Sequence, residues 1–215
     1  GKILNNARKF LARKKSNQVD TPTIRSIKGL IRRGEAKATC RYVGIPDENI
    51  HFQNLPFYET GTIEKKPMSE KDIKPTMELL RSIQPQQVYC AGDFADPHGT
   101  HIVCFNVVLE ALKRIKNDGD EWISDCWLWL YKGAWQEWNI EEIEMAIPMS
   151  PDQVLKKRFG IFIHQSQKDM VPFQGSDSRE FWQRAEERNA DTANLYADLG
   201  LTHYAAMEAF VRWHY

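Results

Sequence analysis

The sequence has no surplus of charge of either sign. Its 215 residues include 29 basic and 29 acidic side chains, which gives a formal net charge of zero at neutral pH. Proteins that bind nucleic acids or anionic membrane surfaces non-specifically do so through an excess of Lys and Arg, and this chain has none. We therefore expect neither nucleic acid nor a membrane among its partners.

Cysteine is also scarce, and the four that occur, at positions 40, 90, 104 and 126, form no C-x-x-C pair. That spacing argues against a structural zinc knuckle, and a chain of this length needs no disulfide framework. No apolar run approaches the roughly 20 residues that a membrane helix requires. Residues 1–15 are basic and helical in spacing but lack the apolar core of a signal peptide. The expectation is a cytoplasmic protein with reduced thiols.

What the chain does have is an alternation of helical and strand-like segments, which is typical of an α/β fold with a mainly parallel sheet. With 42% hydrophobic and 27% charged residues, residues 1–215 are expected to form a single domain. The periodicity predicts helices at residues 3–14, 24–42, 69–83, 98–115, 151–164, 178–199 and 202–214. It predicts strands at residues 50–55, 87–92, 122–131 and 143–147.

The order of these elements is unusual at the beginning, because two helices precede the first predicted strand. A doubly wound sheet usually begins with a strand that leads into a ligand-binding loop. The first residue is also Gly rather than Met. We therefore expect that a first strand and its loop are missing, and that the chain is a portion of a longer domain.

One short segment combines a strand end, two carboxylates and two histidines. The predicted strand ends at Gly92, and Asp93 and Asp96 lie in the loop that follows it. His98 and His101 come next, at the start of a predicted helix. Ligands bind beyond the carboxyl ends of strands in open α/β sheets, and residues three apart on a helix share a face. Both imidazoles can therefore point into one site.

A purely structural interpretation explains part of the same segment. Asp96 is a favourable N-cap and Pro97 a favourable first-turn residue, so helix initiation alone accounts for both. A histidine near a helix start commonly bonds only to water or to a neighbouring carboxylate. From the residues alone, a metal or catalytic pair and a plain helix start are both open.

Longer motifs give a family resemblance that covers nearly the whole chain. DPHGTHIVC resembles the second metal motif, H-P-D-H, of the LmbE/PIG-L zinc deacetylases, and residues 32–36 and 164–167 resemble that family's R-x-x-E-A and H-x-S-Q motifs. The segments LPFYETG, YKGAWQEW and REFWQRAEERN are similar to one bacterial subgroup, in which the domain follows a glucosamine-6-phosphate deaminase-like domain. The resemblance implies the C-terminal portion of a three-layer, LmbE-like (Rossmann-like) fold that lacks its first strand and first metal motif.

The resemblance also implies roles for individual residues. His101 matches the zinc-binding histidine, and His98 matches the histidine that polarises the scissile carbonyl. Arg32 matches the arginine that lines the substrate pocket, with Arg33 as the near alternative. His164 is implied to support the site, although the helix dipole alone favours a histidine at a helix C-terminus.

Two departures from the family pattern weaken the implied metal centre. Thr100 stands where the family has an aspartate between the histidines, so Asp93 or Asp96 would have to replace it. The family's first motif, H-P-D-D, which supplies two ligands and the general base, does not occur in the sequence. Catalytic zinc needs about three protein ligands and an open position for water. We therefore expect zinc in the intact parent domain and none tightly bound by this chain.

The activity that the resemblance implies is zinc-dependent removal of an N-acetyl group from an N-acetylglucosamine-type sugar or its phosphate, with this portion inactive by itself. The alternative is an accessory or degenerate module of a glucosamine-6-phosphate deaminase/isomerase fusion protein. The implied partners are an amino-sugar small molecule, the fused aminosugar deaminase domain and a second copy of the chain in a homo-oligomer.

Two further features have structural and functional interpretations. Trp127 and Trp129 alternate as core residues of a strand do, whereas Trp135 and Trp138 follow a glycine and are better placed to meet a ligand or partner domain. Residues 178–188 alternate in charge at helical spacing, which is typical of a solvated helix. A phosphate clamp at Arg179 or Arg184 is the less favoured interpretation.

Overall fold

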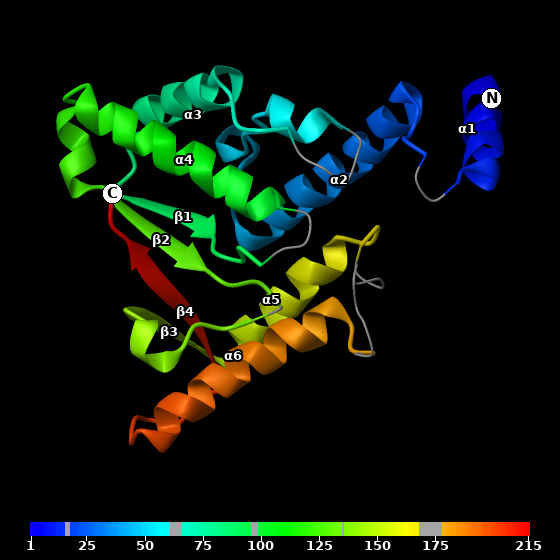
Figure 1. Cartoon of the computed structure of the whole chain (residues 1–215). Helices are drawn as coiled ribbons and strands as arrows, with labels where there is room; N and C mark the ends of the chain where they lie inside the picture. Colours follow the sequence, from blue (N-terminus) through cyan, green and yellow to red (C-terminus); the bar gives the residue numbers. More distant parts are fainter. Residues whose placement is uncertain (16–17, 61–65, 96–98, 135, 168–177) are drawn as a thin grey trace.

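The computed structural model describes residues 1–15, 18–60, 66–95, 99–134, 136–167 and 178–215. Within these residues it has six α-helices and one four-stranded sheet (Figure 1). The helices are α1 (Lys2–Arg13), α2 (Pro22–Val43), α3 (Glu70–Ile83), α4 (Thr100–Asn117), α5 (Pro151–Ile163) and α6 (Phe181–Asp198). The strands are β1 (Gln87–Ala91), β2 (Trp127–Tyr131), β3 (Met145–Met149) and β4 (Ala206–Trp213). Short 3-10 helices, η1 (Asp47–Asn49), η2 (Pro56–Thr60), η3 (Glu121–Asp125) and η4 (Ile140–Glu142), lie between them.

The sheet is mixed, with strand order β1-β2-β4-β3. β1 and β2 are parallel, whereas β4 runs antiparallel to both β2 and β3. The α/β class is confirmed, but the prediction of a mainly parallel sheet is wrong. The physical reason is that the last strand of the chain returns between β2 and β3 in the opposite direction.

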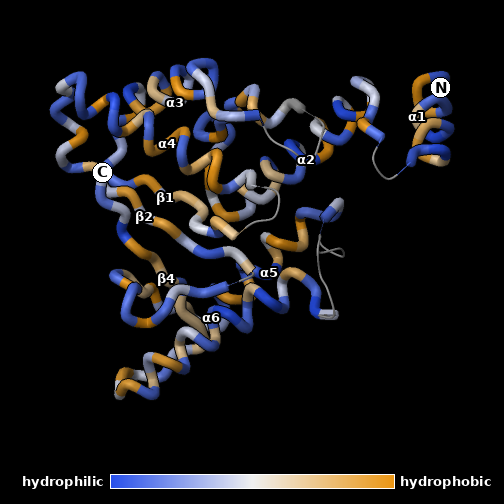
Figure 2. The backbone as a smooth tube through the Cα atoms, in the orientation of Figure 1, coloured by the Kyte–Doolittle hydropathy of each residue, from blue (hydrophilic) through white to orange (hydrophobic). Residues whose placement is uncertain are grey.

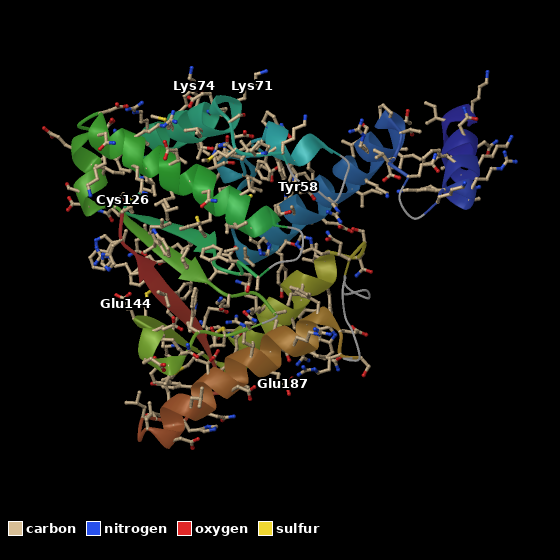
Figure 3. The ribbon with its side chains drawn as sticks, in the orientation of Figure 1. Tyr58, Lys71, Lys74, Cys126, Glu144 and Glu187 are labelled. Atoms are coloured by element: carbon tan, nitrogen blue, oxygen red, sulfur yellow. The ribbon has the colours of Figure 1, made fainter. Side chains whose placement is uncertain are left out.

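The two faces of the sheet pack against different helix pairs, α3 with α4 and α5 with α6 (Figure 1). Leu112 and Ile115 of α4 are fully buried against Leu128 and Leu130 of β2, in a core that α3 also enters. Burying a side chain of this size contributes about 1.5–3 kcal/mol. Charged side chains lie on the outer surfaces of the helices, as Lys71, Lys74 and Glu187 show in Figure 3.

Local capping explains where two helices begin and end. Thr21 accepts a hydrogen bond from the Ile24 N–H at the start of α2, and Gly44 ends that helix with a φ of +96°. At the start of α3, the buried carboxylate of Asp72 accepts hydrogen bonds from the N–H groups of Ser69 and Phe57, at 2.9 and 3.1 Å. Side-chain acceptors at a helix start and a left-handed glycine at a helix end are the usual ways to satisfy the free backbone groups there.

Three segments differ from the predictions. Residues 50–55 form no strand, because no neighbouring strand pairs with them and they only connect η1 to η2. The predicted strand at 122–131 begins at Trp127, after η3. The helix predicted at residues 202–214 is replaced by β4, whose pairing with β2 and β3 outweighs the helical propensity of its Ala, Met and Glu residues.

Helix α1 stands apart from the rest of the described chain (Figure 1). None of its residues is buried, and Ile3, Leu4 and Leu11 are 67%, 51% and 48% exposed. Figure 2 shows hydrophobic and hydrophilic positions alternating along the helix. Ion pairs of 2.7 Å from Asp20 to Lys14 and Lys28 connect its end to α2. Among the described residues, no helix is long and apolar enough to cross a membrane.

Candidate functional site

The loops that follow β1 and β2 are joined at one edge of the sheet. The two strands are parallel, so their carboxyl ends meet where ligands bind in open α/β sheets. Gly92 N–H donates to the Tyr131 carbonyl at 2.7 Å, and the Lys132 ammonium donates to the Gly92 carbonyl at 3.0 Å. The Asp93 carboxylate accepts a 2.7 Å hydrogen bond from the Gly133 N–H. The two loops therefore hold each other in place.

Two glycines permit this close approach. A Cβ atom at Gly133 would lie 2.8 Å from the Asp93 carboxylate, and one at Gly92 would lie 2.8 Å from the indole of Trp138. That indole also lies beneath the Lys132 ammonium, 4.1 Å from the ring centroid. Trp138, which the sequence places near a ligand or partner, thus packs under the joined loops, whereas Trp135 lies outside the described residues.

Asp93 and His101 form the candidate site. Asp93 is 5% exposed, and its second oxygen, Oδ1, is buried without a hydrogen-bond partner in the described part of the chain. His101, in the first turn of α4, has its Nδ1 3.9 Å from Asp93 Oδ2, and this nitrogen is also buried and unpaired among the described residues. A separation of 3.9 Å is too long for a hydrogen bond. Because unpaired buried polar groups are costly, such a pair is a candidate for a functional role.

The described residues do not fit a zinc ion. His101 and Asp93 provide two ligand-type side chains, and no group of three or more His, Cys, Asp or Glu occurs in the part of the chain that the structure describes. Catalytic zinc needs about three protein ligands. His98 and Asp96 lie outside the described residues, so the roles that the resemblance implies for them stay predictions.

The two candidate substrate-binding arginines lie on the exposed side of α2. The Arg33 guanidinium donates a hydrogen bond to the Asn54 side chain and lies 5.6 Å from the ring centroid of Phe52. Arg32 is exposed and lies near enough to Glu35 to lower the pKa of that carboxyl. The observed partners of both arginines therefore belong to α2 and the segment that follows it.

The structure brings together the two motifs at residues 32–36 and 164–167. The Glu35 carboxylate accepts hydrogen bonds from the Ser166 N–H and hydroxyl, at 2.8 and 2.7 Å. Burial alone would raise the pKa of Glu35, but these bonds and the nearby His164 hold it below its ordinary value. His164 itself is the C-cap of α5. The Glu35–Ser166 pair thus connects α2 to the end of α5. Sequence reasoning missed this role of Glu35, because a sequence does not show which distant residues pair.

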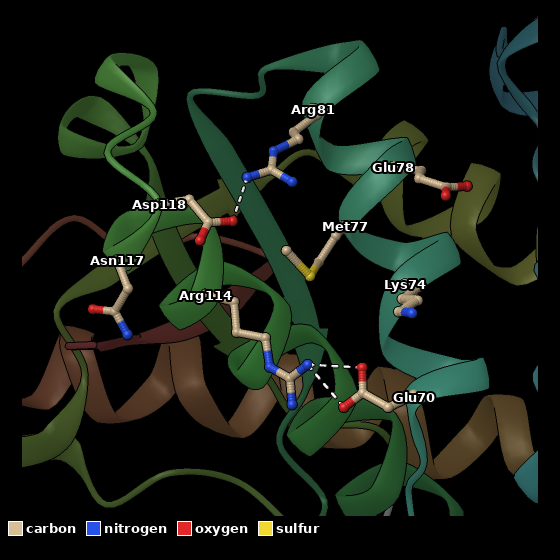
Figure 4. A pocket seen from close by; sticks show the side chains of 8 residues that line it. All are labelled: Glu70, Lys74, Met77, Glu78, Arg81, Arg114, Asn117 and Asp118. Carbon is tan, nitrogen blue, oxygen red and sulfur yellow. Dashed lines mark hydrogen bonds and ion pairs between the residues drawn. The ribbon is translucent and has the colours of Figure 1, made fainter.

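A cavity of about 410 Å³ lies between α3 and α4 (Figure 4). Four of its charged side chains form ion pairs: Arg114 pairs with Glu70 at 2.8 Å and Arg81 with Asp118 at 2.6 Å. These contacts hold the two helices together, and the other two charged side chains of the lining, Lys74 and Glu78, are opposite in sign. We interpret it as structural.

A second cavity lies beyond the carboxyl end of β2, beside Gly133, and it contains residues that sequence reasoning missed. Arg188 of α6 lines it and is 8% exposed, as is Arg184. The prediction that residues 178–188 form a solvated helix face is therefore wrong, because both arginines are buried and Arg188 bonds to Glu208 of β4. The missed signal was a stripe of buried positions with four-residue spacing, at Ala185, Asn189 and Ala193.

The fold and this edge site define an α/β protein that resembles solved structures of the LmbE-like fold. The match to the conserved protein TT1542 from Thermus thermophilus covers 94% of this chain and 76% of the TT1542 chain, with a TM-score of 0.54 and 15% identity. The match to GalB, the 4-carboxy-2-hydroxymuconate hydratase from Pseudomonas putida KT2440, covers 95% of this chain and 78% of the GalB chain, with a TM-score of 0.61 and 13% identity. At these identities the likeness shows the fold alone.

A sequence relative is much more similar. A glucosamine-6-phosphate deaminase-like protein of Bacteroides thetaiotaomicron is 53% identical over 206 residues, which are 96% of this chain. The chain spans only 31% of that relative's length. No family model matches the chain.

These findings correct the family assignment. The resemblance predicts membership of the LmbE/PIG-L deacetylases, but no family model matches and the similar relative carries a deaminase-like name. The likeness to the LmbE-like fold remains, and one protein of that fold is a hydratase. Because one fold supports unrelated chemistries, similarity to this fold is not evidence that the chain is a deacetylase.

Proposed function

We propose that the chain is an accessory, non-catalytic module of a longer glucosamine-6-phosphate deaminase-like protein. The observation that carries the proposal is the 53% identity over 96% of the chain to a relative of which it spans 31%. At that identity the two segments share a fold. The remainder of the longer protein, which we propose to be an aminosugar deaminase domain in the cytoplasm, is then the partner of this module.

The surface of α1 supports a docking role. Ile3, Leu4 and Leu11 form one face of the helix and are about half exposed or more. On α2, Leu30 and Ile31 are also 67% and 48% exposed. Exposed apolar side chains gathered on one face of a helix are characteristic of an interaction site. Covering the three α1 side chains alone would contribute about 3 kcal/mol.

The candidate metal site supports the non-catalytic part of the proposal. Only Asp93 and His101 are assembled in the described residues, and Thr100 stands between the two histidine positions where the resemblance expects an aspartate. A catalytic zinc ion needs about three protein ligands, and the described residues supply two. The role of the module would then be to stabilise or orient the rest of the longer protein, with zinc absent from its function.

A pair of adjacent substitutions tests the docking. In the longer protein, Leu4→Glu is expected to lower the midpoint of thermal unfolding by several degrees, because a charge replaces a buried contact. Asn5→Glu places the same charge one position away on the polar face and is expected to leave the midpoint unchanged. In the isolated chain, where Leu4 is exposed, neither substitution has an effect.

The competing outcome is catalytic. Acetate release from N-acetylglucosamine 6-phosphate by the longer protein, lost in His101→Ala, would show that the module is an enzyme and overturn the proposal. Equal effects of Leu4→Glu and Asn5→Glu on the thermal midpoint would instead show that the apolar face of α1 is not the docking surface.

A further inference from the structure

The cavity beyond β2 has the features of a small-molecule site. Its volume is about 320 Å³, at the lower end of the roughly 300–1,000 Å³ typical of ligand pockets. It is lined by the loop after β2, by α5 and α6, and by β4. Gly133, whose N–H bonds to Asp93, forms part of its wall, so the cavity adjoins the Asp93–His101 pair at the ligand-binding edge of the sheet.

The lining has more basic than acidic side chains. Lys132, Lys157 and Arg188 line the cavity, and Glu208 is the only acidic residue among the described residues that do. Both oxygens of Glu208 are already used, one by Arg188 and the other by Lys157 at 2.5 Å. The carboxylate therefore has no free oxygen to offer a cationic ligand.

The basic side chains keep unused donors. An ammonium group has three N–H donors, yet Lys132 makes one hydrogen bond in the described part of the chain, to the Gly92 carbonyl, and Lys157 makes two. The Arg188 side chain is 7% exposed, and its two terminal nitrogens donate to Glu137 and Glu208. Its Nε is buried without an acceptor among the described residues. Because buried donors without acceptors are costly, the cavity is suited to a ligand that brings acceptors.

Three aromatic rings form part of the remaining wall, together with aliphatic side chains. Tyr131 ends β2, Phe181 begins α6 and Phe210 lies opposite Tyr131 on β4. Such rings pack against the apolar faces of a compact ring, while the cations take its anionic group.

We propose that this cavity binds a small, compact ring compound that carries one anionic group, a phosphate or a carboxylate. The anion lies between the Lys132 and Lys157 ammonium groups, above the buried Arg188–Glu208 pair. The ring of the ligand packs against Phe181 and Phe210. This binding site does not depend on the proposed function, because the cavity is present whether or not the module is docked to the rest of the longer protein.

Three sugars with the same ring test the proposal: glucose 6-phosphate, glucuronate and glucose. Their binding to the chain is measured from the amide chemical shifts of Gly133 and Ala134, which line the cavity. Saturable shifts with one or both anionic sugars at millimolar concentration or below, and none with glucose, are the expected result. The phosphate and carboxylate arms then distinguish the two anionic groups.

Matched lysine variants locate the binding. Lys132→Met and Lys157→Met are each expected to weaken the anionic sugar at least tenfold, whereas Lys156→Met, at the exposed neighbouring position on α5, leaves it unchanged. Equal weakening by Lys156→Met would place the anion elsewhere and overturn the proposal. The wild-type titrations decide it even if a variant fails to fold, because no saturation with either anionic sugar, or equal binding of glucose, contradicts it.

Discussion

Glu35 and Ser166 are 131 positions apart, and both oxygens of the Glu35 carboxylate accept hydrogen bonds from Ser166. One donor is the Ser166 N–H and the other its hydroxyl, at 2.8 and 2.7 Å. The pair connects the middle of α2 to the turn after α5, and both residues belong to motifs that stand out in the sequence. The bond gives a structural role to two residues for which the resemblance implies none.

The first prediction concerns this pair. Glu35→Gln and Ser166→Ala should each lower the free energy of unfolding by about 1 kcal/mol, the usual value for a hydrogen bond near the surface. Ser166→Ala removes the hydroxyl donor, and Glu35→Gln removes the charge and one of the two accepting oxygens. Because both substitutions weaken the same contact, the double variant should cost less than their sum. Chemical denaturation of the four proteins measures this coupling, and strict additivity would show that the contact contributes nothing.

The second prediction concerns the close approach at Gly92. A Cβ atom there would lie 2.8 Å from the Trp138 ring, so Gly92→Ala should force the indole away and destabilise the chain by about 1–3 kcal/mol. Gly29 in α2 has no atom within 4 Å of the same position, and Gly29→Ala should stabilise by about 0.5–1 kcal/mol. Opposite shifts of the thermal midpoint are expected, and a tolerated Gly92→Ala would contradict the packing of the two loops.

The third prediction concerns Glu208, which holds Lys157 and Arg188. Burial alone would raise the pKa of this carboxyl, but the two cations keep it below its ordinary value. The carboxylate therefore stabilises the fold above the unfolded-state pKa of about 4.5, and this stabilisation is lost as the pH falls through the lower folded-state pKa.

Glu208→Gln should accordingly lower the free energy of unfolding by about 3 kcal/mol at neutral pH, because it leaves the partly buried Lys157 without its anion and Arg188 with Glu137 alone. The exposed Glu141→Gln is the control. Urea titrations at several pH values should show the difference between Glu208→Gln and wild type shrinking in acid, and a difference that does not depend on pH would refute the ion pairs.

The fourth prediction concerns the Cys90 thiol. Burial, and to a smaller degree the neighbouring Cys104, raises the pKa of Cys90 from 9.0 to about 12. Because the thiolate is the reactive form, alkylation by iodoacetamide near pH 8 should be roughly a thousandfold slower than for an ordinary thiol. Peptide mass spectrometry gives the rate in native and in urea-unfolded protein, and similar rates in the two states would contradict the burial.

Local signals in the sequence are sufficient to predict much of the fold. The caps at Thr21 and Gly44, the Asp72 cap and the buried strand that ends near Gly92 can all be predicted, because each depends on neighbouring residues. Strand β4 cannot, since its residues favour a helix in isolation and adopt a strand only between β2 and β3.

The candidate site is predictable in part for the same reason. The position of Asp93 and His101 beside a strand end follows from the local pattern, but the bond from Gly133 to Asp93 joins residues 40 positions apart. Lys157, Arg188 and Glu208 come from three elements and show only as ordinary charges in the sequence. Glu208 does carry one signal, as a single carboxylate within the apolar run of β4.

Hydrogen–deuterium exchange of α1 tests the central claim, that this chain is a docked module of a longer protein, most directly. The account predicts that the amides of residues 2–13 exchange at least about tenfold more slowly in the longer protein than in the isolated chain, because docking protects a helix that is otherwise free to fray. Amides of α4, already buried in both, serve as the internal reference. Equal exchange of α1 in the two proteins would contradict the account.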